Sequence, residues 1–461
     1  MSDPKKILIS HAIGEIRTAV CAQDKVTDIR LYRDHVPSYM GTVFLGRVSK
    51  LSKELQAAYV DLGDNISGFL PLKTLPKQLG KKPRDLTTLL HEGQRLIVQV
   101  VSDARSEKQL KLSARIELVT PAVIFHPHRA GAYVSSRIKD PDRREELKKY
   151  GHGLDLVDYG LTFRTDAQHV SNDDLTNVAR TLILQWQDAT RNIKSCPCPS
   201  LLSQPPDPLE QIMREFVSAD TDEILIDDPA LLARAKKWLE TYFPTKAACA
   251  IHYSEKETLF TRYLVEDELE NIMSDRLYLN SGAWITIEQT EALTAIDVNM
   301  GGAQFSIDRA KQIFSLNREA MREIFRQLRL RSIGGIIVID FVDMTDKGDI
   351  KSLQNFADEL MVNDPAPMQR GNISSFGLME VTRSSRGASL HELLVSRVQK
   401  RKNISTVCLE ILRREEQEAS RKPGIPRIVK VTEEQKKWFD LRSELLEHFT
   451  ARTGSILKLE L

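Results

Sequence analysis

Two apolar stretches of the chain each carry an aspartate near the carboxyl end: Asp297 in "LTAIDVN" and Asp340 in "IIVIDFV". Both stretches are rich in β-branched residues, which predicts buried strands. In an α/β sheet, functional sites collect outside the carboxyl ends of the strands. Alternate side chains of a strand share a face, so Asn299 is expected beside Asp297. We expect these three side chains to converge on one site.

The two carboxylates and the amide offer hard oxygen ligands. Mg²⁺ accepts one or two protein carboxylates, keeps several waters and takes its remaining ligands from substrate phosphate. Such an ion can orient a water for attack on phosphorus and stabilise charge on the phosphoryl oxygens. The residue pattern alone leaves a structural alternative open, in which Asp297 caps the loop behind it and Asp340 caps the turn at "DMTDKGD".

The composition is typical of a globular protein, with 461 residues, 41% hydrophobic content and a net charge of +1. A charge so close to zero neither indicates nor excludes nucleic acid, because a local basic surface is enough to bind it. No apolar run approaches the roughly 18–20 residues of a membrane helix, and the N-terminus has no signal-peptide core. Five scattered cysteines do not make a disulfide framework. We therefore predict a cytoplasmic protein without a membrane segment.

The elements that must position the site change in texture along the chain. Between residues 41 and 115, short apolar runs such as "GTVFLGRV" and "RLIVQVV" predict four or five strands, which suits a small OB-type barrel. Ser171 and Asp174 have the spacing of a capping box, which predicts a helix that begins after Ser171. The following "SCPCPSLLSQPPDP" reads as a linker, and its two cysteines, one residue apart, do not supply a four-ligand zinc site.

From Asp207 the pattern becomes α/β, with Asp-Pro helix starts at Asp207 and Asp228. Strands flank a long helix, "DRAKQIFSLNREAMREIFRQLRLR", that the double glycine "GG" at 334–335 is expected to end. One face of that helix carries Ile313, Asn317, Ala320, Ile324 and Leu328. A charged stretch, "LLVSRVQKRKNISTVCLEILRREEQEASRK", is predicted to be helical and to lead into a small αβ tail. The fold class is α/β multidomain.

The motifs "TEALTAIDVN" and "RQLRLRSIGGIIVIDFVDM", in this order, resemble the catalytic core of the ribonuclease E/G family of endoribonucleases. The resemblance runs from about residue 5 to 386, with a weaker echo in the last thirty residues. It implies Mg²⁺-dependent hydrolysis of single-stranded RNA that leaves 5′-phosphate and 3′-hydroxyl ends. By the same resemblance, Asp297 and Asp340 are expected to hold the catalytic Mg²⁺, and Asn299 is expected to orient the site around the scissile phosphate.

The resemblance also implies a domain plan: ribonuclease H-like and DNase I-like α/β parts with an inserted OB-fold β-barrel. The expected domains are a discontinuous ribonuclease H-like subdomain (1–40 and 207–276), an OB-fold RNA-binding domain (41–115), a 5′-phosphate-sensing region (116–206), a DNase I-like catalytic domain (277–395) and a C-terminal helical stretch with the αβ tail (396–461).

Two further RNA contacts follow from the resemblance. Tyr59 and Phe69 match aromatics that stack on bases, and Lys108 in "SEKQLKLS" matches a phosphate-binding lysine. From the residues alone, barrel core remains the alternative for both aromatics. Arg164 and Thr165 in "GLTFRTDAQHVS" match the pocket for a 5′-terminal monophosphate, where a guanidinium can fork onto two phosphate oxygens.

The pattern departs from the family after "ISSFGLMEVTRSSRGASLHELL". Many members continue with Cys-Pro-x-Cys, half of a zinc site between two subunits, whereas this chain has a single Cys408 and no CxxC there. We expect no zinc link, while a homodimer held by protein surfaces stays open. Without a long scaffold tail, the chain resembles the shorter, ribonuclease G-like form.

The expected activity is cleavage of A/U-rich single-stranded RNA, stimulated by a 5′-monophosphate, in rRNA and tRNA processing and mRNA decay. A non-catalytic RNA-binding protein of the same fold is the rival from another class. A DNA nuclease is a third alternative, because an OB barrel alone does not exclude DNA.

Overall fold

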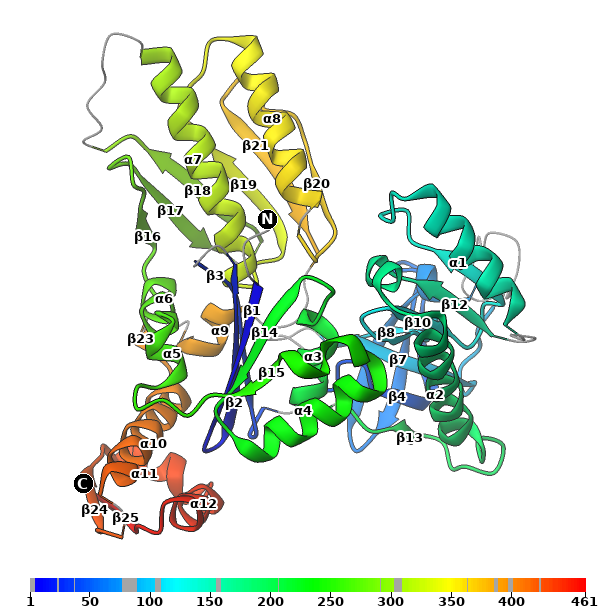
Figure 1. Ribbon diagram of the computed structural model, residues 1–461, viewed down its shortest axis with the longest axis horizontal. Helices are drawn as coiled ribbons and strands as arrows, with labels where there is room; N and C mark the ends of the chain where they lie inside the picture. The colour runs from blue at the N-terminus through cyan, green and yellow to red at the C-terminus, as the bar shows by residue number, and fades with distance from the viewer. Residues whose placement is uncertain are drawn as a thin grey trace. The chain divides into compact units, whose positions relative to one another are not determined.

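The chain folds into two compact units (Figure 1), of which unit 1 comprises residues 1–7 and 36–254, and unit 2 comprises residues 8–35 and 255–461. The computed structural model describes residues 5–22, 25–36, 38–76, 89–103, 109–154, 159–205, 207–290, 292–301, 309–362, 364–384, 389–396, 401–422 and 424–461. Within these ranges, no helix combines the length and the apolar character that a membrane span requires.

The barrel strands of unit 1 form a closed sheet. Its strands are β4 (Val43–Ser52), β5 (Ala57–Gly63), β6 (Ile66–Pro71), β7 (Arg95–Ser102) and β8 (Leu110–Ser113). They follow the order β4-β5-β6-β8-β7, and β7 pairs back with β4 to close the ring. Alternate side chains such as Val48, Val60 and Leu70 fill the interior. The predicted OB-type barrel is therefore confirmed.

The proline-rich segment predicted as a linker contributes a strand to the barrel sheet. β13 (Ser200–Ser203) pairs antiparallel with the start of β4. Arg47 and Arg95 donate hydrogen bonds to the carbonyl oxygens of Cys198 and Cys196, at 2.8 and 2.9 Å. The linker interpretation was wrong for these residues, because the first residues of β4 extend beyond β5 and β13 satisfies their backbone groups.

A second sheet of unit 1 has the order β11-β12-β10-β9 and carries two helices. Its elements are β9 (Leu118–Val119), β10 (Val123–His126), β11 (Gly131–Val134), β12 (Gly160–Phe163), α1 (Pro141–Gly153) and α2 (Asn172–Thr190). Helix α2 begins where predicted, because Ser171 Oγ accepts a hydrogen bond from the backbone N–H of Asp174. Its buried face carries Leu175, Val178, Leu182 and Trp186.

The remainder of unit 1 alternates helices and strands as predicted. These elements are α3 (Pro208–Phe216), β14 (Thr221–Ile226), α4 (Pro229–Tyr242) and β15 (Ala250–His252). Asp207 caps α3 and Asp228 caps α4, each accepting backbone hydrogen bonds from the first turn. β14 and β15 pair in parallel.

Unit 2 contains a strand meander, a large sheet and a C-terminal helical part. The meander is β1 (Lys5–Ala12, whose first residues belong to unit 1), β2 (Glu15–Ala22) and β3 (Lys25–Arg33). Short helices α5 (Leu259–Arg262) and α6 (Val265–Ile272) precede the large sheet. The C-terminal part comprises α9 (Leu390–Leu394), β22 (Val395–Ser396), β23 (Arg401–Lys402), α10 (Ile404–Arg421), β24 (Arg427–Lys430), α11 (Glu433–Asp440), α12 (Glu444–Thr453) and β25 (Leu457–Glu460).

The C-terminal helix begins later than the sequence suggests. The stretch from residue 393 was expected to be helical throughout, but α9 ends at Leu394 and the short strands β22 and β23 pair before α10 begins. Asn403 starts α10 by accepting a hydrogen bond from the N–H of Thr406. Asn is among the preferred N-cap residues, whereas the charged residues before it are not, so the helix begins after Asn403.

The large sheet of unit 2 has the order β16-β17-β18-β19-β21-β20. Its strands are β16 (Arg276–Tyr278), β17 (Trp284–Gln289), β18 (Thr294–Asn299), β19 (Gly335–Asp340), β20 (Met368–Arg370) and β21 (Leu378–Arg383). Helices α7 (Arg309–Leu330) and α8 (Lys347–Val362) cover one face, as Figure 1 shows. The other face is open, and side chains alternate between the helical core and this open face.

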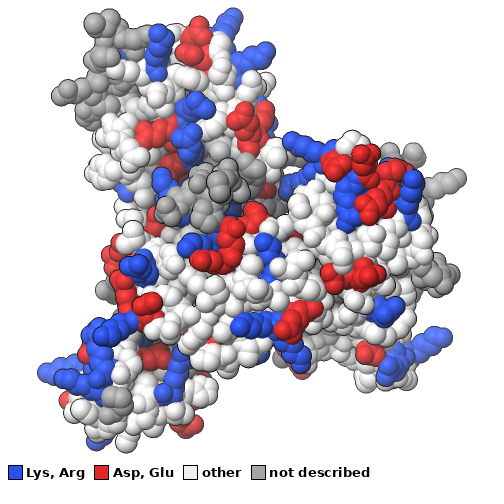
Figure 2. Space-filling model, viewed as in Figure 1, with Lys and Arg blue, Asp and Glu red and all other residues white. Residues whose placement is uncertain are grey.

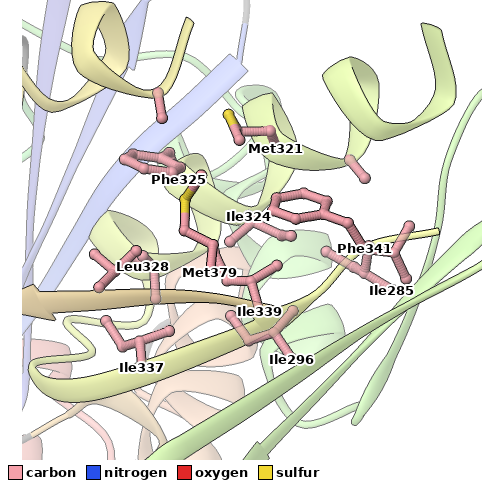
Figure 3. Packing of buried hydrophobic residues seen from close by; sticks show 14 of the residues in the cluster. Ile285, Ile296, Met321, Ile324, Phe325, Leu328, Ile337, Ile339, Phe341 and Met379 are labelled. Carbon is pink, nitrogen blue, oxygen red and sulfur yellow. The ribbon is translucent and has the colours of Figure 1, made fainter. Parts of the chain in front are cut away.

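The core between α7 and the sheet consists of branched and aromatic side chains. Figure 3 shows Ile324 and Leu328 of α7 facing Ile296, Ile337 and Ile339 of the central strands. All five are buried. This contact stabilises the helix against the sheet, since burial of each such side chain contributes roughly 1.5–3 kcal/mol.

The end of α7 differs from the expectation that a double glycine stops it. The helix ends at Leu330, and the residue in the left-handed region is Ser332, with φ of 55°. Gly335 has φ of 98° and begins β19 instead. Gly335 therefore lies in the turn that leads into β19, where the positive φ favours glycine.

A buried ionic cluster joins the meander to α10 within unit 2. Glu15 is 1% exposed and contacts Arg33 at 3.2 Å, Arg17 at 3.8 Å and Arg413. Burial by itself would raise the pKa of Glu15, but the charges of Arg413, Arg17 and Arg33 lower it below its ordinary value of 4.5. The carboxylate thus holds three arginines together.

We predict that Glu15→Gln lowers the free energy of unfolding by about 3–5 kcal/mol at pH 7, because Arg17, Arg33 and Arg413 lose the buried carboxylate that they share. Arg17 keeps a second ion pair, with Glu266 at 2.8 Å. Since the folded pKa of Glu15 lies below the unfolded one, the wild type loses this stability as the pH falls below 4.5. The difference between wild type and variant should therefore shrink on acidification. Urea unfolding at several pH values measures it.

The matched control is Glu359→Gln, because Glu359 is exposed on α8. Its unfolding free energy should stay within about 0.5 kcal/mol of the wild type. A deficit for Glu15→Gln that is the same at pH 7 and pH 3 would contradict the electrostatic account.

Candidate active site and nucleic-acid interface

Strands β18 and β19 bring the two predicted carboxylates side by side. The strands pair in parallel, and Asp297 lies directly opposite Asp340 in the register. Neighbouring strands lie about 4.8 Å apart, and register partners point to the same face. Asn299 shares this face and donates a hydrogen bond from Nδ2 to Asp297 Oδ2 at 2.6 Å. The convergence expected of these three side chains is present on the open face of the sheet.

The electrostatics of the pair suit a cation. Burial first, and then the negative charges of Asp297 and Asp343, raise the pKa of Asp340 above its ordinary value. A divalent ion would relieve this repulsion, and Mg²⁺ needs only one or two protein carboxylates. Within the described part of the chain, no group of three or more His, Cys, Asp or Glu side chains is arranged to hold a metal. Water and substrate phosphate would have to complete the ligand set.

Gly377 lies against the carboxylates from the loop before β21. Its φ is 77°, and it accepts a hydrogen bond from the backbone N–H of Phe341 at 3.3 Å. A Cβ at this position would come within 3.2 Å of the Phe341 carbonyl oxygen and 3.4 Å of Asp343 Oδ1. The positive φ therefore disfavours any side chain at this position, and the close Phe341 carbonyl oxygen would also have to shift by a few tenths of an ångström.

Asn317 of α7 anchors the chain that follows Asp340. It is completely buried, donates to the Val342 carbonyl oxygen at 2.7 Å and accepts from the Val342 N–H at 3.1 Å. Val342 lies between Asp340 and Asp343, so this clamp positions the loop that carries both acids. The sequence placed Asn317 on the apolar face of the helix without a role. A lone amide in an apolar stripe was the available signal, since buried polar groups find partners.

On the barrel, Tyr59 and Phe69 lie opposite each other on β5 and β6. Their ring centroids are 5.8 Å apart in an edge-to-face arrangement, and neither ring belongs to the barrel core. The register extends this row to Lys50 on one side and Lys111 on the other, and both lysines are exposed. Lys108 lies outside the described residues.

This row, which we call the barrel row, has two adjacent aromatic rings flanked by lysines, in the order Lys50, Tyr59, Phe69 and Lys111. Sequence reasoning missed the two lysines, although strand alternation could have pointed to them. On the face shown in Figure 2, Lys and Arg are interspersed with Asp and Glu. RNA affinity would therefore depend on local features such as the barrel row, whose rings and lysines are of the types that stack on bases and attract phosphates.

Arg164 follows β12 and Thr165 opens a short 3₁₀ helix. Arg164 Nη1 donates to the Thr120 carbonyl oxygen at 2.7 Å. Asp166 accepts from the backbone N–H of Ala219 at 2.9 Å, and burial raises its pKa although Ala219 and Arg164 act against this. A guanidinium, a hydroxyl and a carboxylate thus lie next to one another in sequence at the end of this strand.

A barrel with outward aromatic rings and lysines, followed in the chain by an α/β sheet with a carboxylate pair, defines a protein that combines an RNA-binding module with a candidate hydrolytic site. Residues 40–115 match the sequence model of the S1 RNA binding domain, and residues 118–386 match that of the Ribonuclease E/G family. The chain belongs to the ribonuclease E/G family. The resemblance seen in the motifs is confirmed.

Ribonuclease E and ribonuclease G proteins are similar along most of this chain. Ribonuclease E of Haemophilus influenzae is 31% identical over 84% of this chain and 42% of its own length. Ribonuclease E of Escherichia coli K12 is 32% identical over 84% of this chain and 37% of its own length. Ribonuclease G of Salmonella typhimurium is 29% identical over 88% of this chain and 86% of its own length. The chain thus spans less than half of these two ribonuclease E proteins.

We predict that Asn317→Leu lowers kcat by about tenfold to a hundredfold with little change in KM, because the loop carrying Asp340 and Asp343 loses its clamp and shifts. The free energy of unfolding should fall by about 1–3 kcal/mol, since the backbone N–H and C=O of the half-buried Val342 lose their side-chain partners. Steady-state cleavage of a labelled RNA and urea unfolding measure the two effects. Asn355→Leu, at an exposed position of α8, is the control. Wild-type kcat in a destabilised Asn317→Leu variant would show that the clamp does not position the site.

Proposed function

We propose that this chain is a Mg²⁺-dependent endoribonuclease that hydrolyses single-stranded RNA and leaves 5′-phosphate and 3′-hydroxyl ends. The observation that carries the proposal is the register that places Asp297 opposite Asp340, with Asn299 bonded to Asp297. Membership of the ribonuclease E/G family supports the reaction class, and the S1 match supports RNA as the substrate.

In this proposal, Asp297 and Asp340 hold the ion and Asn299 fixes the orientation of the Asp297 carboxylate. A bound divalent cation supplies charge stabilisation at the phosphate and activates water. Asn317 and Gly377 keep the Asp340 loop in place. The barrel row stacks on bases without strong sequence preference, and its lysines contact phosphates, so binding should weaken with salt.

The wider role is proposed from the family and not from the geometry. We assign the enzyme to rRNA and tRNA processing and mRNA decay in the cytoplasm, on A/U-rich RNA. Residues 277–395 would be the DNase I-like catalytic domain, with residues 1–40 and 207–276 as the ribonuclease H-like subdomain. Within residues 116–206, Arg164 and Thr165 would bind a 5′-monophosphate.

Any pairing of two copies would use protein surfaces without a zinc link. Cys408 is completely buried in the C-terminal core, and burial raises the pKa of its thiol to about 12. A metal ligand needs the thiolate form, which this environment disfavours.

Asp297→Asn tests the catalytic assignment. We expect the cleavage rate to fall by about 10³-fold, because loss of a ligand removes several kcal/mol of charge stabilisation at the phosphate. RNA binding to the barrel should persist. The assay is cleavage of a labelled A/U-rich oligonucleotide with Mg²⁺, with excess EDTA, and with DNA of the same sequence.

Glu288→Gln is the matched control, because Glu288 is an exposed acid on the open face of β17 and its loss changes the local charge equally. It should leave the rate within a few-fold of the wild type. RNA binding without cleavage by the wild type in Mg²⁺ would instead favour the non-catalytic RNA-binding protein.

Arg164→Gln tests the 5′-end proposal. The wild type should cleave 5′-monophosphorylated RNA faster than 5′-hydroxyl RNA, and the variant should cleave both at the slower rate, because the guanidinium that holds the phosphate is gone. Unchanged cleavage of 5′-hydroxyl RNA by the variant serves as its folding control. Equal rates of the wild type on both RNAs would remove this assignment.

A further inference from the structure

The edge of the open sheet face carries three side chains that the catalytic proposal does not use. Arg276 and Tyr278 lie on the edge strand β16, and Trp284 lies on β17. The rings of Tyr278 and Trp284 have centroids 6.3 Å apart, and the guanidinium carbon of Arg276 lies 4.8 Å from the Trp284 centroid. We call these three residues the aromatic platform.

The platform shares its rows of side chains with the carboxylate site. Tyr278 pairs with Trp284, which pairs with Asn299. Arg276 pairs with Thr286, which lies opposite Asp297. Two strand spacings, roughly 10 Å, therefore separate the platform edge from the proposed catalytic side chains, on the same face of the sheet. That is within reach of the nucleotides next to a phosphate bound there.

Packing explains Trp284 in part but not Tyr278. A Cβ on Gly301 would come within 2.7 Å of the Trp284 ring, so the indole packs on the loop that follows Asn299. Tyr278 is 73% exposed and contributes little to the core. Single exposed apolar residues are common, but an exposed ring joined to an indole and a guanidinium is a stacking surface.

We propose that the aromatic platform binds a base of the RNA substrate close to the scissile phosphate. Tyr278 and Trp284 supply the stacking surface, and Arg276 supplies positive charge for the adjoining phosphate. Stacking on the two rings does not depend on base identity, so the subsite accepts any base but requires that a base be present. This inference rests on the proposed endoribonuclease function and adds a second grip on RNA, in unit 2, to that of the barrel row.

An RNA strand is the occupant that the geometry favours over a second copy of this chain. The platform lies in register with the carboxylate pair, so a substrate phosphate at that pair brings its neighbouring nucleotides to this edge. The cation in the platform also complements RNA phosphate.

The test compares Tyr278→Ala with Tyr278→Phe on a labelled single-cut oligonucleotide and on versions that carry one abasic nucleotide at successive positions. We expect Tyr278→Ala to raise KM by roughly 5- to 100-fold with kcat within a few-fold, and Tyr278→Phe to resemble the wild type, since stacking needs only the ring. One abasic position near the cut should raise KM for the wild type but not further for Tyr278→Ala.

A second measurement does not depend on cleavage. Asp297→Asn protein should lose tryptophan fluorescence on binding the intact oligonucleotide, and less on binding the version with the critical abasic position. Leu441→Ala, at a position 81% exposed and remote from the sheet in sequence, is the control for loss of an exposed apolar side chain. It should match the wild type in every assay.

Two results would overturn the platform without touching the nuclease proposal. One is a wild type and a Tyr278→Ala variant that respond alike to every abasic position. The other is unchanged cleavage by Tyr278→Ala combined with a shift in sedimentation, which would make the platform a contact between copies. Cleavage by Asp297→Asn at the wild-type rate would instead refute the assignment of Asp297, while the KM comparison of Tyr278→Ala with the wild type on the abasic series would still report on the platform.

Discussion

The parallel pairing of β18 with β19 is the constraint on which the rest of unit 2 depends. Parallel neighbours cannot be joined by a tight turn, so the chain must cross over between them, and here α7 lies in that connection. The crossover helix buries Ile324 and Leu328 on the same side chains, Ile296 and Ile339, that alternate with the two aspartates. A slip of one residue would move those isoleucines to solvent and the carboxylates into the core. Core packing therefore sets the register that brings Asp297 opposite Asp340.

Placing two carboxylates side by side costs free energy, and contacts of the surrounding structure keep the two side chains in place. Burial and the acidic neighbours raise the pKa of Asp340. The ionised form of this carboxyl is therefore disfavoured without a cation, and a bound cation would favour it. Asn317 prevents the loop from relaxing away from this repulsion, and Gly377 allows a second loop to approach without a side chain. In the proposed metal site, a divalent ion would relieve this repulsion.

The barrel row and the aromatic platform, on two different sheets, have the same arrangement of side chains. In the barrel row, Tyr59 and Phe69 are flanked by lysines, and in the aromatic platform, Tyr278 and Trp284 lie beside Arg276. In each case neighbouring strands place side chains of the same face in one line, which suits a strand of nucleotides with a base and a charge at every step. A protein with net charge close to zero can hold RNA in this way.

The sequence by itself determined the elements that rest on local chemistry. Apolar and β-branched runs marked the strands of the barrel and of β18 and β19, and Ser171, Asp207 and Asp228 marked helix starts, because strand preference and capping act over a few residues. The motifs around Asp297 and Asp340 also identified the family. Tertiary structure alone decided what the sequence left open or misplaced: β13 as a barrel strand, the burial of Asn317 against Val342 and the register that lines up the lysines with Tyr59 and Phe69. Each of these depends on which distant segment supplies the partner for a backbone group or a face, and that choice is made by packing across the chain rather than by neighbours in sequence.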